Sequence, residues 1–453
     1  MRTHQKIGIG LAILSLATSA AAQKGAAALR KELKQRESAA AKDDADAIVE
    51  SAKWASAKGV TKDAARLLKK ALKIDPDHEG ANTAMGLVKV GDEWVTREKA
   101  KDLEQKAHDA DMKAKGFVQV DGVWVAKDKT DDAKRGVFWH DGQQVSRDDK
   151  RNFSMGRVRH PRTGVFIDAD DLGKAESGMF PTDNGWVSED EANKYHSDRN
   201  RPWVVRTEYA TLLSTMPIAK LEEFKIAVDS AIDTVRAVFG GEHAPPTNRP
   251  TVWVAHDAEA YREYGNATGS GGESSYGVFL SPVSLDVPGL GQVRPAFCDN
   301  HKDWGPYYVK HAAALAYAAG YCAAHGVAAP EWFLRGVGAL AERFQVPGQT
   351  AHFAKQHVAK GGVRTLKSWF SAFAINGEME AKERDYNIFQ AGLVLHYAMK
   401  GGDEKATAAL QDLCKTIAER PKESAAKRAF EKFEHVIIDA QDGVRAHLQA
   451  ISR

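Results

Sequence analysis

The sequence predicts an α+β protein made of several domains. The chain has 453 residues, and at roughly 100–200 residues per domain this length predicts two to four domains. Between about 87 and 190, five glycine-containing turns are each followed by aromatic or β-branched residues, a pattern typical of β-hairpins. After residue 201 a helical pattern, then strands, then several helices follow, an order that favours an α+β domain.

Composition is that of a globular protein with no strong charge bias. Hydrophobic residues make up 43% and charged residues 27% of the chain. Lys and Arg number 63 against 61 Asp and Glu, which leaves a formal charge of +2. Such a balance supplies no basic excess to hold a phosphate backbone. We therefore expect no nucleic-acid partner.

The first 22 residues have the layout of a secretory signal peptide. Arg2 and Lys6 precede an apolar run from Ile7 to Ala17, and small residues end at Ala22. We expect cleavage after Ala22 and a mature chain that starts at Gln23, in the periplasm or outside the cell. A spanning helix needs roughly 20 apolar residues, so we expect no permanent membrane span; the alternative is a short uncleaved anchor.

Residues 23–90 are predicted to be helical and to form the first domain after the signal. The informative residues are Gly59, Ala64, Leu68, Ala71 and Pro76. Small residues at these spacings allow two antiparallel helices to approach closely, and Ala81 to Val88 is expected to start a further helix. The pattern resembles one tetratricopeptide repeat and the start of a second. One repeat provides little concave surface, which favours a helical spacer over a peptide-binding groove.

Residues 91–200 are predicted to be a string of hairpins that ends in a linker at 195–202. The turns are Gly91-Asp92, Asp121-Gly122, Asp141-Gly142, Thr163-Gly164 and Asn184-Gly185. Asp-Gly provides the positive φ angles of a two-residue turn. Trp124 and Trp186 are candidates for binding a glycan or peptide by stacking. The alternative, which we favour, is that they form the small cores of these units.

The remaining chain, 201–453, is predicted to be one α+β domain. The expected helices and strands are Leu221–Phe239, Thr251–His256, Gly277–Ser281, and then about 306–325, 330–345, 386–399 and 403–418. The helix with Tyr308 to Tyr317, followed about fifteen residues later by Pro330 to Glu342, resembles the core of gluzincin-type metallopeptidases of the exported peptidase-MA-like group. The resemblance covers roughly 205–450, and it implies a zincin-like fold.

The resemblance also implies a metal site whose residues are replaced. An active member needs His-Glu-x-x-His on the first helix and a Glu ligand on the second. The first His corresponds to His311, but the Glu falls on Ala312, the second His on Leu315 and the last ligand on Arg335. Neither Ala nor Leu can bind a metal, and a guanidinium is cationic. We therefore expect no metal, no cofactor and no catalytic residues at these degenerate positions.

A guanidinium beside two apolar positions needs an acceptor. Glu331, one helical turn before Arg335, is the nearest internal candidate. The functional alternative is a carboxylate on a bound peptide or partner.

These observations favour an exported, non-catalytic pseudo-metallopeptidase that acts as a binding or scaffolding module in the cell envelope, with a protein or peptide as its partner. The candidate binding residues are His311, Arg335, Tyr386, His396, Trp124 and Trp186. One alternative is a hydrolase with a rebuilt active site in the same cleft, with His311 or His396 as the base. Another is a structural envelope protein that binds through its Trp-containing hairpins.

Three cysteines cannot all pair within one chain. Cys298 with Cys322 is the candidate disulfide, and Cys414 is left over. The alternative is that all three are small buried apolar residues.

Overall fold

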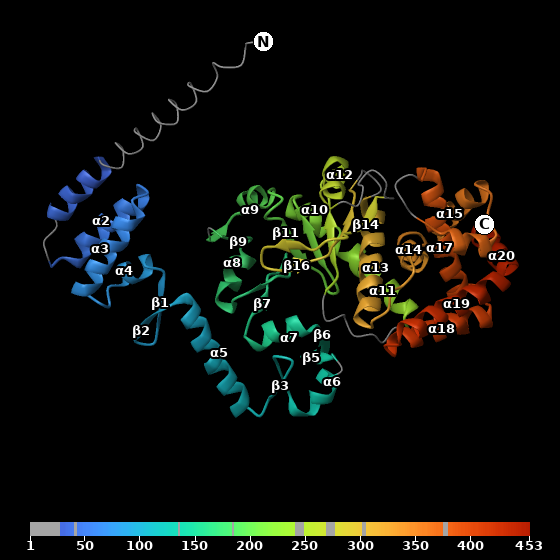
Figure 1. Cartoon of the computed structure of the whole chain (residues 1–453), viewed down its shortest axis with the longest axis horizontal. Helices are drawn as coiled ribbons and strands as arrows, with labels where there is room; N and C mark the ends of the chain where they lie inside the picture. The colour runs from blue at the N-terminus through green and yellow to red at the C-terminus, as the bar shows by residue number, and fades with distance from the viewer. Residues whose placement is uncertain are drawn as a thin grey trace, which may run out of the picture. The chain divides into compact units, whose positions relative to one another are not determined.

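The computed structural model describes residues 28–39, 43–134, 136–183, 185–240, 249–268, 277–300, 305–374 and 379–453 (Figure 1). The predicted signal peptide, 1–22, and the expected cleavage before Gln23 lie outside these residues. Helices and small sheets are mixed, so the α+β class is confirmed. The chain forms two compact units, Met1–Gly116 and Phe117–Arg453. No described helix is long and apolar enough to cross a membrane.

The first unit is a helical hairpin followed by a small β-hairpin. Its elements are a helix at 28–39, α2 (Ala45–Ala57), α3 (Thr61–Ile74), α4 (Glu79–Ala84), β1 (Leu87–Val90), β2 (Glu93–Thr96) and α5 (Arg97–Ala114). Small buried residues such as Ala55 and Ala71 lie where α2 and α3 pack together. The expectation of a helix from Ala81 to Val88 is wrong beyond Ala84. Gly86, with φ of 79°, ends the helix, and the alternating residues of β1 then pair with β2.

Antiparallel hairpins lie at the predicted turns, and four of them open the second unit; residues 160–165 separate β7 from β8, so Thr163-Gly164 does not form a two-residue turn. Their strands are β3 (Val118–Val120) with β4 (Val123–Val125), β5 (Phe138–His140) with β6 (Gln143–Val145), β7 (Val158–Arg159) with β8 (Phe166–Ile167), and β9 (Phe180–Thr182) with β10 (Gly185–Val187). Asp121 and Asp141 have φ of 48° and 47°, and the glycines that follow them also have positive φ. These are the angles of the two-residue turn that Asp-Gly favours.

A helix follows each hairpin, so the repeated unit is ββα. The helical segments are α5 after the first hairpin and then η1 (Lys127–Lys129) with α6 (Thr130–Lys134), α7 (Arg147–Ser154), η2 (Ala169–Asp171) with α8 (Leu172–Glu176), and α9 (Glu189–His196). Side-chain caps begin several of them: Ser146 accepts a hydrogen bond from the Asp149 amide, and Ser188 forms a capping box with Glu191.

A five-stranded mixed sheet lies at the centre of the second unit. In spatial order its strands are β11 (Trp203–Arg206), β12 (Thr211–Ser214), β13 (Thr251–Val254), β17 (Ala296–Cys298) and β14 (Val278–Leu280). The two outer strands are antiparallel to their neighbours and the central pairs are parallel. Along β13, Val252 and Val254 contribute to the main core, whereas Trp253 contributes to a smaller aromatic core. This alternation covers both faces of the sheet.

Helices supply the rest of the unit. They are α10 (Ile218–Glu222), α11 (Lys225–Val238), α12 (Ala258–Ala267), α13 (Gly305–Ala324), α14 (Glu331–Arg343), α15 (Pro347–Ala359), α16 (Leu366–Ala372), α17 (Ala381–Lys400), α18 (Glu404–Ala418), α19 (Glu423–Asp439) and α20 (Gln441–Ile451); β15 (Leu285–Val287) and β16 (Gly291–Val293) form a separate ribbon. The buried helix α13 packs against the sheet, and α14 packs between α13 and α17 (Figure 1).

The last hairpins are continuous with the sheet. The Arg206 amide donates to the Thr163 carbonyl at 2.7 Å, and the rings of Phe180 and Trp203 pack edge to face at 5.1 Å. Phe180 belongs to the same core as the sheet. The linker-like residues 195–202 therefore lie inside the second unit.

The candidate disulfide is not formed. Cys298, Cys322 and Cys414 are all free and buried. Cys298 lies on β17, Cys322 on α13 and Cys414 on α18, where each side chain belongs to the apolar core. The alternative, three buried apolar thiols, is the arrangement found.

We expect these thiols to be almost unreactive in the folded protein. Burial raises the pKa of Cys322 and Cys414 to about 12 and raises the pKa of Cys298 as well, so little thiolate forms below pH 9. In urea, where the chain is unfolded, iodoacetamide at pH 8 should label all three cysteines. In the same time it should label none of them in the folded protein. Rapid labelling of the folded chain would contradict the packing described here.

Candidate functional site

The residues that the resemblance assigns to a replaced metal site lie where α13 packs against α14. His311, Ala312 and Leu315 are 0, 0 and 1% exposed. Nδ1 of His311 lies 2.9 Å from Oε2 of Glu342, which is also 0% exposed. A Cβ on Gly338 would lie 2.5 Å from Nε2 of His311. The imidazole is therefore enclosed between a carboxyl group and the backbone of α14.

Arg335 lies at the outer edge of the sheet, where it contacts the edge strand β14. Its Nη1 donates to the Val278 carbonyl on β14 at 3.0 Å. The Gly277 carbonyl accepts the Asp299 amide just after β17, and the Ser281 amide donates to the Pro295 carbonyl just before it. Because the backbone groups of alternate residues point to opposite sides of a strand, the Val278 carbonyl faces away from β17. The predicted partner is confirmed, because Nε of Arg335 lies 3.5 Å from Oε1 of Glu331.

A chain of ionisable groups continues from His311 toward the surface. Arg343 contacts Glu342 through Nε at 3.1 Å and Asp385 through Nη2 at 2.7 Å. Asp385 also pairs with Lys360, which is partly exposed. Burial lowers the pKa of His311 and raises the pKa of Glu342. The imidazole is thus held neutral, and its role here is that of a buried hydrogen-bonding group.

The other candidates on α17 are occupied by contacts within the chain. Tyr386 is 3% exposed, and its hydroxyl donates to the Gly362 carbonyl and contacts Gln390. His396 lies 2.9 Å from His447, and burial, with a smaller effect of His447, lowers the pKa of His396 to about 4.

The two tryptophan candidates differ in burial. Trp124 is 5% exposed. Trp186 is half-buried, and its ring stacks on His160 at 6.2 Å with Lys174 over it at 5.8 Å. Trp124 is therefore too buried to stack on a ligand in this conformation, and the Trp186 ring is already in contact with His160 and Lys174.

No group of three or more His, Cys, Asp or Glu side chains among the residues that the structure describes could hold a metal ion.

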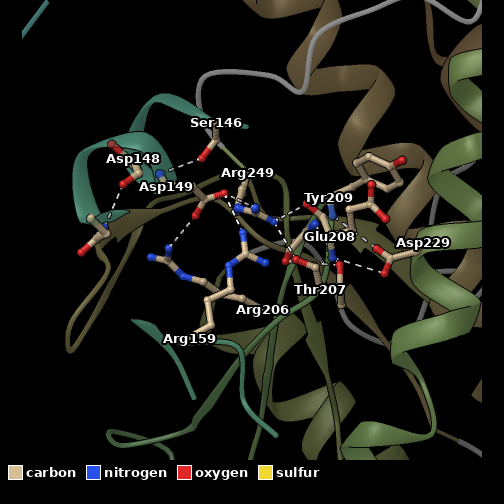
Figure 2. A network of polar contacts seen from close by, with 12 residues as sticks. Ser146, Asp148, Asp149, Arg159, Arg206, Thr207, Glu208, Tyr209, Asp229 and Arg249 are labelled. Atoms are coloured by element: carbon tan, nitrogen blue, oxygen red, sulfur yellow. Dashed lines mark hydrogen bonds and ion pairs between the residues drawn. The ribbon is translucent and has the colours of Figure 1, made fainter. Parts of the chain in front are cut away.

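A second polar cluster, which sequence reasoning missed, lies where α7 and β7 meet the sheet (Figure 2). Asp149, on α7, is 0% exposed and is held by three arginines from distant segments. Arg159 contacts it at 3.1 Å and Arg206 at 3.5 Å, and Arg249 forms a further ion pair. Arg249 also donates to the carbonyls of Thr207 and Glu208 at 2.7 and 2.6 Å. Because these arginines are far apart in sequence, no motif predicts the cluster.

The contact between His311 and Gly338 gives a stability prediction. Replacing Gly338 with Ala should destabilise the protein by about 1–3 kcal/mol, because the new methyl group meets a fully buried ring. Gly320→Ala on α13 is the matched control, since nothing lies within 4 Å of its Cβ position. There the better helix propensity of Ala should stabilise by up to about 1 kcal/mol. Urea unfolding of both variants checks the contrast, and equal effects would contradict it.

A buried histidine near Tyr386 gives a pH prediction. His357 lies between Tyr386 and Phe389, with ring centroids 4.3 and 4.5 Å away, and burial lowers its pKa to about 3 despite the neighbouring Asp385. In the unfolded chain the pKa of His357 is near 6.5. Between about pH 6.5 and pH 3 the unfolded chain therefore binds more protons than the folded one, and the free energy of unfolding falls as the pH falls through this range.

His357→Phe keeps the ring packing and removes this proton binding. Between pH 7.5 and 5 the unmodified protein should lose about 2 kcal/mol more of unfolding free energy than the variant. Urea unfolding at the two pH values measures the difference. Parallel losses would show that His357 is protonated in the folded protein.

Comparison with known proteins gives no match to a family model, to a curated protein or to a solved structure. We therefore infer function from the geometry of the described residues.

Proposed function

We propose that this protein is a non-catalytic pseudo-metallopeptidase of the cell envelope that binds or scaffolds a protein or peptide partner. The observation that carries the proposal is the position of His311, the one retained residue of the metal motif. It is fully buried and bonded to Glu342 on the helix that would supply the last metal ligand. The location in the envelope rests on the predicted signal peptide.

The contacts around His311 argue against the hydrolase alternative. A catalytic base must reach the proton that it removes from a substrate or water. His311 is 0% exposed, and Gly338 lies directly against its Nε2. His396 is paired with His447, and its pKa of about 4 makes it a weak base at neutral pH.

Arg335 supports the same view from the sheet side. In the family that the sequence resembles, a ligand Glu would stand at this position, whereas here a guanidinium is bonded to the Val278 carbonyl. The contact occupies a backbone acceptor on the outer edge of β14, next to the helices that correspond to the metal site. A cation there repels a divalent metal and ties α14 to the sheet.

The first test is metal content and peptidase activity. Purified protein dialysed against Zn²⁺-containing buffer should retain far less than one equivalent of zinc and should not cleave casein. Stoichiometric zinc that survives dialysis, or hydrolysis that a chelator abolishes, would overturn the proposal.

The second test restores the missing side chains. Ala312→Glu, Leu315→His and Arg335→Glu together should give measurable zinc affinity if α13 and α14 have gluzincin geometry, because imidazoles one helical turn apart can share one ion. Ala312→Glu with Leu315→Ala and Arg335→Glu is the matched control and should bind much more weakly. A folded triple variant that takes up no zinc would show that the resemblance does not extend to the site.

A further inference from the structure

The cluster around Asp149 lines a large cavity in the second unit. The cavity has a volume of about 920 Å³ and lies between α7 and the β7–β8 hairpin on one side and the β11–β12 connection with α11 on the other. Arg159, Arg206 and Arg249 all line it. Arg206 and Arg249 also line a second cavity of about 620 Å³. Volumes of this size are typical of sites for small molecules.

The charges at the centre of the cluster do not balance. Asp149 is the one carboxylate that the three guanidinium groups share, so the cluster carries two positive charges in excess. The 920 Å³ cavity has further charged groups on its walls, namely the acids Asp141, Glu208 and Asp229 and the bases Lys225 and Arg236, and the ionisable side chains of His140, His160 and Tyr209 line it as well.

The acids on the walls are engaged elsewhere or exposed. The Asp229 carboxylate accepts the backbone amides of Glu208 and Tyr209, both at 3.3 Å (Figure 2). Asp141 lies near His140, and its side chain is 90% exposed. Solvent screens an exposed carboxylate strongly. Glu208 is also exposed. Glu208 and Asp148 act electrostatically on Arg159 and Arg206, but their effect on the pKa of these arginines is smaller than that of Asp149. A positive excess therefore remains at the three arginines.

The arginines also have hydrogen-bonding capacity left over. The Nε atoms of Arg159, Arg206 and Arg249 are buried and have no hydrogen-bond partner within the described chain. The Arg249 side chain is only 10% exposed, so water does not compensate fully. Burial lowers the pKa of Arg159 and Arg206, which expresses the cost of holding these cations together. Such a cluster is stabilised by an additional anion.

We propose that this cavity binds a ligand with a doubly charged oxyanion group, the chemistry that phosphate monoesters and dicarboxylates share. Two negative charges match the excess at the cluster. The planar guanidinium groups donate in the fork geometry that phosphate and carboxylate oxygens accept. Asp149 acts as a positioning residue, because it holds three guanidinium groups together while Ser146 fixes the start of α7.

Titration calorimetry on the full chain at fixed ionic strength tests the proposal. The probes are inorganic phosphate, phenyl phosphate and succinate, with acetate as the singly charged control. We expect at least one dianion to bind in the micromolar to millimolar range and acetate to bind at least tenfold more weakly. Binding of phosphate and phenyl phosphate but not of succinate would identify a phosphate ligand. Binding of succinate alone would identify a dicarboxylate. No binding by any dianion, or equal binding of acetate, would overturn the proposal.

Variants at Arg159 test the location. This side chain is 32% exposed, the most of the three, so Arg159→Gln should leave the fold intact. It should weaken dianion binding about tenfold or more, and Arg159→Lys should weaken it less, because the charge remains but the fork is lost. The matched control is Arg157→Gln. Arg157 is a partly exposed arginine just before β7 that pairs with Asp168 and lines neither cavity.

Equal binding by Arg159→Gln and the unmodified protein would place the ion elsewhere and overturn the assignment. If Arg159→Gln fails to fold, Arg206→Gln is tested instead, by the rise in its melting temperature when phosphate is added. A rise as large as that of the unmodified protein would likewise overturn the assignment. The site is separate from His311 and Arg335, so zinc binding in the restored variant has no bearing on the outcome.

Discussion

The close approach of α14 to its two neighbours is the constraint on which the C-terminal half of the structure depends. A Cβ on Gly336 would lie 2.8 Å from the Ala391 carbonyl oxygen of α17, and one on Gly338 would lie 2.5 Å from His311 on α13. Gly392 makes the reciprocal approach from α17. Only glycine fits at such distances, so α14 can be buried on both sides. The burial of Glu342 and Arg343 follows from this position, and their contacts with one another then become obligatory.

The two polar clusters illustrate different ways to bury charge. At α14, Arg343 is shared between Glu342 and Asp385, and Lys360 brings a further cation to Asp385. Each charge there has a partner of opposite sign, which is what a structural network requires. At Asp149 three cations surround one anion. That imbalance is costly in a folded chain alone, and it is the reason to look for a ligand there rather than beside His311.

The sequence predicts local features better than contacts between distant segments. Two of the hairpins follow from the Asp-Gly turns at Asp121 and Asp141, and the Glu331 partner of Arg335 follows from one helical turn. The helices after the hairpins were missed although Ser188 and Glu191 form a recognisable capping box. The contacts of Asp149 with Arg249 and of His311 with Glu342 join residues 100 and 31 positions apart. Such pairs depend on how the elements pack, which periodicity and spacing do not specify.

The three free cysteines determine what the second unit requires in order to fold. Because Cys298, Cys322 and Cys414 fill apolar space without a covalent bond, the second unit needs no oxidant and no disulfide isomerase to reach its native state. Under reducing conditions its folding involves no slow reshuffling of wrongly paired thiols, whereas in an oxidising compartment these thiols must be buried before they pair. The native packing of the second unit is therefore the same in a reducing and in an oxidising compartment, once the thiols are buried.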